Sequence, residues 1–317
     1  MTTELIGHQP IVAYFERARQ NGYLSHAYLL VGPAHVGKST LVTKLLTGIF
    51  SLPASAAVRS HPDIFWLKQE VQEKTGKKKQ HIDVEQLRDL RSVLSRRPFV
   101  GPVTAAVIDA AEKMNIQAAN ALLKTLEEPS PGTIIFLLTS DESALPTTIR
   151  SRCQLLYLHS VSTSEISAAL VRRGAALLEA DRLARLSCGL PGQAFIWLES
   201  PDEYERFHLA AEQFHDLFGE AFYKKRLATE PFFSGEDQVL TRAGLRDVFF
   251  IWQTLLRDWV WVQAGLAERR MYDLTEPKTW SLARGREIET AIREALRLLK
   301  TNVQPRFVLE SVLLAMP

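Results

Sequence analysis

An eight-residue segment near the start of the chain, Gly32–Ser39 with the sequence GPAHVGKS, limits the possible folds more than any other stretch. An apolar run at 27–31 leads directly into it, and a helical pattern at 40–46 follows. A glycine, four residues and then Gly-Lys-Ser between a strand and a helix is the pattern of a phosphate-binding loop. The alternative is an ordinary turn rich in glycine and proline. The flanking strand and helix favour the phosphate loop.

Individual residues of this loop have expected roles in binding ATP or ADP with Mg²⁺. Gly32 and Gly37 let backbone N–H groups turn toward an anion at the positive end of the following helix dipole. Lys38 is expected to reach the β- and γ-phosphates, and the Ser39 hydroxyl to hold Mg²⁺. Thr40, the next residue, completes the contacts expected from the loop.

The composition is that of a globular protein with two or three domains, since 46% of the 317 residues are hydrophobic and 23% are charged. The 38 Lys and Arg nearly balance the 36 Asp and Glu, so no strong overall field draws the chain to nucleic acid. Cys153 and Cys188 have no metal-ligand spacing. Neither a signal peptide nor a membrane-spanning apolar run is visible, so we expect a cytoplasmic protein without membrane contact.

Strand patterns alternate with helical patterns over the first half of the chain. Strands are expected at 27–31, 64–67, 104–108, 133–138 and 154–158. The alternation predicts an α/β domain with a parallel sheet covered on both faces. Ligands of such sheets bind beyond the carboxyl ends of the strands, where Gly32–Ser39, Asp109 and Ser140 all fall.

From about residue 162 onward only helical patterns remain. Short helices are expected at 164–172, 180–187 and 191–198, and long amphipathic ones at 245–264 and 284–301. The helix at 245–264 carries aromatic side chains on much of its circumference, which predicts burial in a bundle or a subunit contact. These aromatic positions are Phe249, Phe250, Trp252, Trp259 and Trp261.

Asp109 closes a strand after the phosphate loop, where an aspartate that holds Mg²⁺ is expected. In hydrolases of this kind a glutamate usually follows directly, but here the next residue is Ala110 and the next acid is Glu112. Because a methyl group cannot activate water, the site is expected to bind nucleotide better than to hydrolyse it. Ser140 is expected either to contact the γ-phosphate or the attacking water, or to be a simple strand-end hydroxyl.

Two basic features have alternative interpretations. Arg152 is expected to face outward, where its guanidinium would stabilise the γ-phosphate of a neighbouring subunit. Without such a partner it is one arm of a surface ion pair. Lys77–Lys79 belong to an exposed charge run, which we interpret as a solvated loop in preference to a DNA contact.

Several segments together resemble the AAA+ clamp-loader subunits of bacterial DNA polymerase III. The strongest are Gly32–Ser39, Val107–Asp109, Asn120–Pro129 with the sequence NALLKTLEEP, and Ile149–Cys153 with the sequence IRSRC. Three further segments extend the resemblance over nearly the whole chain. Ile6–Gln9 is similar to the adenine-side box of the family, and Gly189–Ala194 is similar to its second-domain sensor region. Asn302–Glu310 is similar to the C-terminal end of its delta-prime-type members.

The resemblance implies three domains: an AAA+ nucleotide-binding domain at 1–160, a small helical lid at 161–200 and an all-α collar at 201–317 that oligomerises. It implies a hetero-pentamer with motor and delta-type subunits that loads a sliding clamp on primed DNA. Arg152 would be the arginine finger that acts in trans. Ile6, Gly7 and His8 would flank the adenine, and Ser140 matches the first sensor position.

Departures from the family pattern refine these expectations. Many members carry a four-cysteine zinc module after the phosphate-loop helix, but 50–66 contains no cysteine, so no zinc is expected. Ala110 replaces the hydrolytic glutamate, and Gln193 stands where motor subunits present a sensor arginine. A stator with weak or no ATPase activity of its own is therefore the prediction. The alternatives are an ATP-hydrolysing motor subunit, and an unrelated P-loop kinase that uses Asp109 as base.

Overall fold

The structure is a computed structural model that describes residues 4–53, 57–70, 81–233, 238–267, 270–272, 274 and 276–317. Lys77–Lys79 lie outside the described residues, so the two interpretations of that run both stay open. The chain divides into two compact units, Met1–Phe195 and Ile196–Pro317, and each is described by itself. The segment expected to form the lid falls largely within the first unit. The three-domain division stays a prediction.

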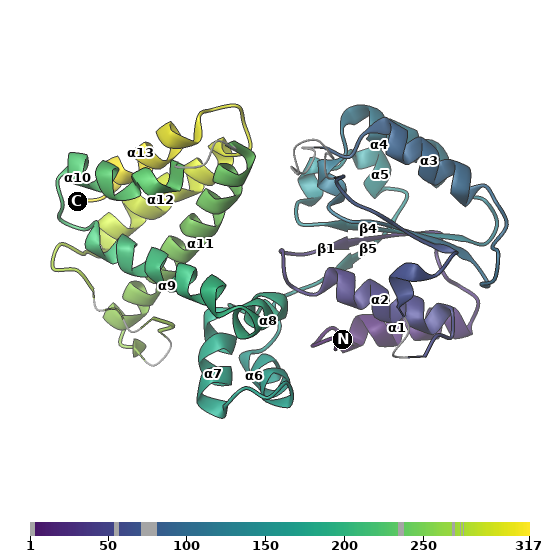
Figure 1. Cartoon of the computed structure of the whole chain (residues 1–317), viewed down its shortest axis with the longest axis horizontal. Coiled ribbons are helices and arrows are strands. Elements are labelled where there is room, and N and C mark those ends of the chain that lie inside the picture. The colour runs from purple at the N-terminus through teal and green to yellow at the C-terminus, as the bar shows by residue number, and fades with distance from the viewer. Residues whose placement is uncertain are drawn as a thin grey trace. The chain divides into compact units, whose positions relative to one another are not determined.

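The first unit is built around a parallel five-stranded sheet, as expected (Figure 1). Its strands are β1 (Ala27–Val31), β2 (Ile64–Leu67), β3 (Thr104–Ile108), β4 (Thr133–Thr139) and β5 (Gln154–Tyr157), in the order β2-β3-β4-β1-β5. The strand that leads into the phosphate loop is therefore central: Leu29 is in register with Leu137 on one side and Leu155 on the other. Strands buried on both faces read as continuous apolar runs, which is why β1, β3 and β4 were recognisable in the sequence.

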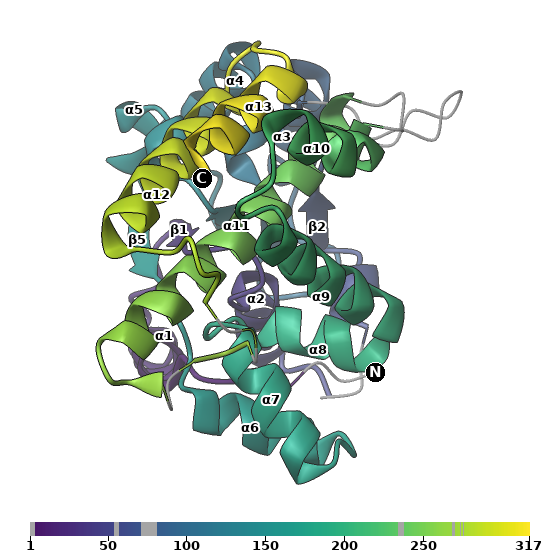
Figure 2. The same ribbon diagram turned by 90° about the vertical axis from the view of Figure 1, so that its left-hand side faces the viewer.

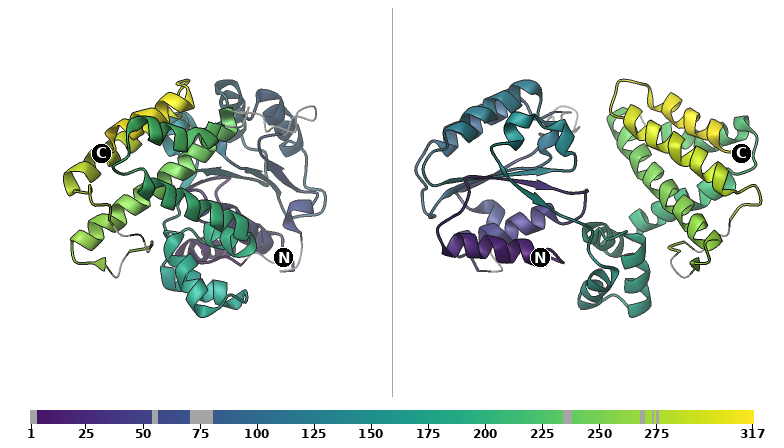
Figure 3. Two further views of the ribbon diagram at one scale, coloured as in Figure 1. Left: turned by 60° about the vertical axis from the view of Figure 1, so that its left-hand side comes forward. Right: turned by 180° about the vertical axis from the view of Figure 1, so that it is seen from behind.

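Helices cover both faces of this sheet (Figure 3). α1 (Gln9–Gln20) and α2 (Lys38–Ile49) lie on one face, and α3 (Val84–Leu94), α4 (Ile116–Glu127) and the short α5 (Thr147–Arg150) lie on the other. Alternate residues of β1 enter different cores: Tyr28 packs with Phe15 and Phe136 on the α1–α2 side, whereas Leu29 packs with Leu122 on the α3–α4 side. Each fully buried side chain of this size contributes about 1.5–3 kcal/mol.

Polar caps fix where α3 and α4 begin. Asp83 accepts a hydrogen bond from the N–H of Gln86, and the Gln86 side chain accepts one from the N–H of Asp83, which forms a capping box. Asn115 accepts from the N–H of Ala118 at 2.8 Å and starts α4. The second cap sets the register of the helix that carries most of the NALLKTLEEP segment.

The rest of the first unit consists of short helices. α6 (Thr163–Arg172) and α7 (Leu177–Leu186) pack against each other and precede α8 (Pro191–Glu199), as Figure 2 shows. α7 begins three residues before the expected helix at 180–187. Single 3₁₀ turns, η1 (Val58–Ser60), η2 (Ala111–Lys113) and η3 (Glu142–Ala144), connect strands and helices of the α/β part.

The second unit is entirely helical in its described part. It comprises α9 (Pro201–Asp216), α10 (Phe222–Thr229), η4 (Glu230–Phe233), α11 (Gln238–Gln263), α12 (Leu282–Leu298) and α13 (Pro305–Ala315). Phe249, Trp252 and Trp259 of α11 are fully buried, and Phe214 of α9 stacks on both tryptophan rings. Burial of these three aromatic residues confirms the prediction made for 245–264, but Phe250 is 39% exposed and Trp261 is only half-buried. None of the described helices has the length and apolarity to cross a membrane.

Candidate nucleotide site and the surface that carries Arg152

The phosphate loop connects β1 to α2 at the carboxyl end of the sheet, and its two glycines are required there for different reasons. A Cβ on Gly32 would lie 2.7 Å from the carbonyl oxygen of Leu158, so a larger residue would displace the backbone. Gly37 caps α2 with φ of +109°, a conformation that L side chains rarely adopt. The loop therefore has the conformation that its sequence predicts, with the N-terminus of α2 directly behind it.

Lys38 lies over the loop that it is expected to serve. Its Nζ donates to the carbonyl oxygens of Gly32 at 2.6 Å and Pro33 at 2.8 Å. Burial lowers the pKa of Lys38, and the negative charges of Glu112 and Asp109 partly oppose that shift. The ammonium group, Asp109 and Glu112 therefore act on one another at the mouth of the loop, which is the charge pattern of a Mg²⁺–phosphate site.

Asp109 follows the buried strand β3, and its N–H donates to the carbonyl oxygen of Leu67 at 2.8 Å. The next residue, Ala110, has φ of 56° and ψ of 54°, a left-handed conformation that begins the η2 turn. Its methyl group offers no base to an attacking water, whatever its orientation. The structure thus places Asp109 at the loop and leaves the position after it without a carboxylate.

Glu112 belongs to the site although the sequence analysis gave it no role. Ser140, directly after β4, donates its hydroxyl to Oε1 of Glu112 at 2.7 Å. The other carboxylate oxygen of Glu112 is buried and has no hydrogen-bond partner among the described residues. Its place three residues after Asp109 was the one available signal, since the η2 turn returns that residue to the carboxyl end of the sheet.

The segment expected on the adenine side lies directly on the phosphate loop. His8 caps α1 with φ of 58°, and its Nε2 is 3.0 Å from the carbonyl oxygen of Val36. Ile6 is buried, and a Cβ on Gly7 would lie 2.9 Å from a methyl carbon of Val161. The structure therefore brings His8 to the loop, whereas Gly7 lies against Val161.

The start of α8 contacts the same loop. The N–H of Gly192 donates to the carbonyl oxygen of His35 at 2.9 Å, and the carbonyl oxygen of Gly189 accepts from the N–H of Val161 at 2.9 Å. Gln193, the residue compared with a sensor arginine, follows immediately. Sequence spacing alone could not predict the contact between Gly192 and His35, because these residues are more than 150 positions apart in the chain.

The role of Ser39 and Asp109 in holding Mg²⁺ stays a prediction. The Ser39 hydroxyl and the Asp109 carboxylate are oxygen donors of the kind that Mg²⁺ prefers, and Mg²⁺ keeps its other positions for water and phosphate oxygens. Within the described ranges, no group of three or more His, Cys, Asp or Glu residues converges on a common point. The sequence-based expectation that zinc is absent stays a prediction.

Arg152 lies on the other side of the sheet from α2. It follows α5, donates through Nη1 to the carbonyl oxygen of Thr148 at 2.9 Å and pairs through Nη2 with Oε1 of Glu127 at 2.8 Å. About a third of the arginine side chain (35%) and half of the glutamate side chain (49%) are exposed. Within this chain, Arg152 thus forms a surface ion pair with Glu127 at the end of α4. It is separate from the group formed by Lys38, Asp109 and Glu112.

Two further surfaces of the first unit were not found from the sequence. A groove between α3 and α4 presents the cationic side chains of Arg88, Arg91 and Lys124. After α3, a loop exposes 85% of Phe99 and 70% of Val100. A period-3.6 pattern identifies buried positions of a helix, but it does not show which exposed faces become neighbours across two helices.

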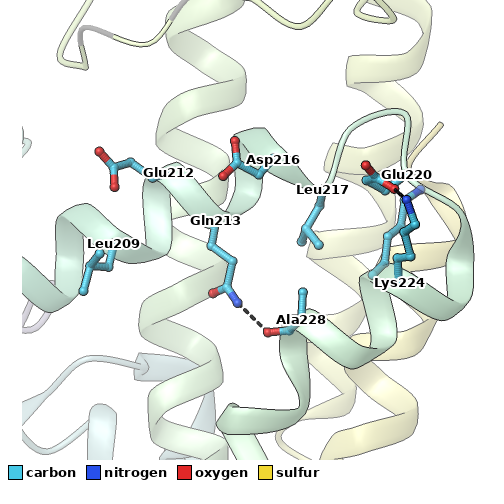
Figure 4. Close-up of a pocket in the computed structure, with 9 residues that line it drawn as sticks. Leu209, Glu212, Gln213, Asp216, Leu217, Glu220, Lys224 and Ala228 are labelled. Carbon is cyan, nitrogen blue, oxygen red and sulfur yellow. Dashed lines mark hydrogen bonds and ion pairs between the residues drawn. The ribbon is translucent and has the colours of Figure 1, made fainter.

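The helical unit has a groove of its own between α9 and α10 (Figure 4). Glu212, Asp216 and Glu220 contribute carboxylates along it, and Gln213 donates to the carbonyl oxygen of Ala228 at 2.6 Å. Lys224 pairs with Glu220 at 2.9 Å, and Lys225 also lines the groove, so three carboxylates lie beside two ammonium groups.

Comparison with known proteins places this arrangement in a family. The family model described as DNA polymerase III, delta subunit, matches residues 7–162, which include the phosphate loop, Asp109, Ser140 and Arg152. The subunit delta' of Pseudomonas aeruginosa is 39% identical over 142 residues, 41% of this chain and 42% of that protein. The subunit delta' of Bacillus subtilis is 26% identical over 92% of this chain and 90% of its own. The chain belongs to the delta-prime family of DNA polymerase III subunits.

The similarity of this delta-prime family member to its relatives differs between sequence and structure. The chain spans about 42% of the length of the Pseudomonas relative that it matches, so activity and partners of the whole relative are not transferred with the family. A solved structure of a DNA polymerase III gamma subunit-related protein from Thermotoga maritima has a TM-score of 0.51 over 95% of this chain and 97% of its own. With 19% identity, that likeness shows the shared fold alone.

Proposed function

We propose that this delta-prime family member is a stator subunit of a clamp loader in the replicative DNA polymerase III holoenzyme. It holds ATP or ADP with Mg²⁺ statically at Gly32–Ser39. It supplies Arg152 in trans to the nucleotide site of a neighbouring motor subunit. In a hetero-pentamer with motor and delta-type subunits, it helps to load a sliding clamp on primed DNA.

The observation that carries this proposal is the separation of two parts of an ATPase centre within one chain. Lys38, Asp109 and Ser140 gather at the carboxyl end of the sheet, whereas Arg152 lies beyond α5 on the α3–α4 face, next to Glu127. An arginine that stabilises the γ-phosphate of a neighbour is worth about 10³–10⁵ in rate. The position of Arg152 is suited to a neighbour and unsuited to the nucleotide of its own subunit.

A static nucleotide is supported by what stands at two positions of the site. Ala110 cannot act as a base, and positioned general-base help is worth about 10²–10⁴ in rate. Gln193, next to the Gly192–His35 contact, carries no charge for the phosphates. The loop itself, with Lys38 and Ser39, retains everything needed for binding.

Two surfaces support contacts with other members of the assembly. Arg88, Arg91 and Lys124 form a cationic groove suited to the phosphates of primed DNA. Phe99 and Val100 offer exposed apolar side chains to a protein partner such as the clamp or another subunit.

The second candidate function is an ATP-hydrolysing motor subunit. The intact phosphate loop favours it, and so does a DNA polymerase III subunit tau/gamma from Haemophilus influenzae that is 28% identical over 52% of this chain. A P-loop kinase has no comparable support in the described residues. ATP hydrolysis by the isolated chain distinguishes the motor from the stator.

The test is the ATPase activity of the reconstituted loader with clamp and primed DNA, in wild type and Arg152→Ala. Arg17→Ala is the control, because Arg17 also donates to the carbonyl oxygen four residues earlier, on exposed α1. The stator proposal is supported if the isolated chain does not hydrolyse ATP and if Arg152→Ala, but not Arg17→Ala, lowers ATP turnover by the complex. Hydrolysis by the chain alone, unaffected by Arg152→Ala, contradicts it and favours the motor subunit.

A further inference from the structure

Arg152 is restrained at two points although it lies on the surface. Nη1 donates to the carbonyl oxygen of Thr148, and Nη2 pairs with Oε1 of Glu127. The Thr148 contact comes from the turn that precedes Arg152, but Glu127 comes from the end of a different helix, α4. The direction of the guanidinium is therefore set jointly by two elements of the fold.

The location of Glu127 is electrostatically unfavourable for α4 itself. It is the last residue of the helix, and Glu128 follows as the C-cap. Carboxylates at a helix C-terminus face the negative end of the helix dipole, which favours cations there. A carboxylate at this position does not stabilise α4, which indicates that it has a role outside the helix. The group that its negative charge stabilises is the nearby guanidinium of Arg152.

We infer that Glu127 is a positioning residue for Arg152 in the reaction of the neighbouring subunit. This inference rests on the proposed function. An unrestrained arginine would lose rotamer freedom when it engages a phosphate, whereas one held by Glu127 and Thr148 has lost most of that freedom beforehand. The guanidinium has five N–H donors in a planar fork, and the two described contacts leave donors free for phosphate oxygens.

The opposite effect would arise if Glu127 competed with the phosphate. Its negative charge would then hold Arg152 back, and removal of Glu127 would increase the rate. The two possibilities have opposite signs in the same measurement. The second contact, to the uncharged carbonyl oxygen of Thr148, favours positioning because a competitor alone would not need it.

The experiment measures ATP turnover of the reconstituted loader, with clamp and primed DNA, for Glu127→Ala, Glu127→Gln and Glu128→Ala. Glu128→Ala is the matched control, since it removes the neighbouring exposed carboxylate from the same helix end. Glu127→Ala is expected to lower kcat about two- to fivefold, as loss of one exposed ion pair does, with little change in KM for ATP. Glu127→Gln should restore part of the rate because its amide oxygen still accepts from Nη2.

A double variant separates positioning from a general structural effect. In an Arg152→Ala background, Glu127→Ala should cause no further loss, and thermal unfolding of the single variant should match wild type. Wild-type or faster turnover of Glu127→Ala, or an additional loss in the double variant, would overturn the inference while Arg152 keeps its role. If Arg152→Ala itself leaves turnover unchanged, the proposed function fails, and the inference fails with it.

Discussion

The backbone N–H of Gly192, at the start of α8, donates to the carbonyl oxygen of His35 within the phosphate loop at 2.9 Å. The glycine approaches so closely that a Cβ there would lie 2.9 Å from that oxygen and 3.2 Å from the Cα of His35. The start of α8 and the phosphate loop thus contact each other backbone to backbone. A change at this contact is therefore expected to act on the stability of the first unit and, if the loop binds nucleotide as proposed, on that binding as well.

Gly192→Ala should destabilise the first unit and weaken nucleotide binding. The atoms that a new Cβ would meet are backbone, so one of the two segments must move, at a cost of about 1–3 kcal/mol. Thermal unfolding and titration with a fluorescent ATP analogue measure the two effects. Gly48→Ala is the control: Gly48 lies inside α2 with nothing within 4 Å of its Cβ position, so that change should be neutral or stabilising. Equal behaviour of the two variants would contradict the tight contact.

His35 should make stability depend on pH on the acidic side of neutrality. Partial burial, followed by the nearby Lys38 ammonium, lowers the pKa of His35 below its ordinary value of 6.5. The unfolded chain then binds a proton at a higher pH than the folded chain. The stabilisation is complete above pH 6.5 and is lost as the pH falls through the folded-state pKa.

The measurement is the unfolding midpoint of wild type and His35→Asn from about pH 5 to 8. Asparagine tolerates the left-handed backbone of this position, where φ is 62°, and it does not titrate. The wild-type midpoint should fall more steeply than that of the variant as the pH decreases below 6.5. Parallel curves would show that His35 has no such effect. The effect should be small, because the side chain keeps contact with solvent.

Asp63 should hold the loop that exposes Phe99 and Val100. Its carboxylate, on a residue only 4% exposed, accepts from the N–H groups of Phe99, Val100 and Gly101 at 2.6–2.8 Å. Burial alone would raise the pKa of Asp63, but these three hydrogen bonds bring it below its ordinary value of 3.8. Its contribution to stability is therefore present above pH 3.8 and is lost as the pH falls further.

Asp63→Asn should lower the free energy of unfolding by about 3 kcal/mol at neutral pH, since the amide carries one acceptor oxygen and no charge. Denaturant unfolding at pH 7 and near pH 3.5 checks this, with the difference expected to shrink at the lower pH. Asp89→Asn, an exposed position on α3, is the control and should change little. A difference that is equally large at both pH values would contradict the role of the charge.

The sequence was sufficient to predict the strands and helices, but it was insufficient to predict which of them lie side by side. The three central strands β1, β3 and β4 were recognisable because buried parallel strands are continuous apolar runs, and the edge strands β2 and β5 carry shorter apolar runs. The positions of Lys38 and Asp109 follow from the ends of β1 and β3. The strand order and the closeness of Ser140 to Glu112 depend on how β4 and the η2 turn lie beside each other. No periodicity in the sequence encodes that distance.

The surface of Arg152 shows the same limit. The IRSRC segment marked Arg152 as a candidate, and an ion pair was the expected alternative to a role in trans. Its partner was not predictable, because Glu127 lies in a segment that the sequence analysis treated as part of a motif and never as a neighbour of Arg152. The cationic groove was likewise hidden, since Arg88 and Arg91 approach Lys124 only when α3 packs on α4.

If the groove between α3 and α4 contacts primed DNA, charge removal there should change the salt dependence of loader binding. Removing one cation that neutralises a phosphate should reduce the slope of log affinity against log salt concentration by about 0.9. Arg91→Ala is therefore expected to weaken DNA binding by the reconstituted loader most at low salt and to flatten this slope by about 1. Fluorescence anisotropy with a labelled primer–template over a range of salt concentrations measures both quantities.

Arg293→Ala, which removes an exposed arginine of α12 in the other unit, should leave the slope unchanged. An unchanged slope for Arg91→Ala would mean that the groove does not carry phosphate contacts, and the DNA would then have to be held by other subunits.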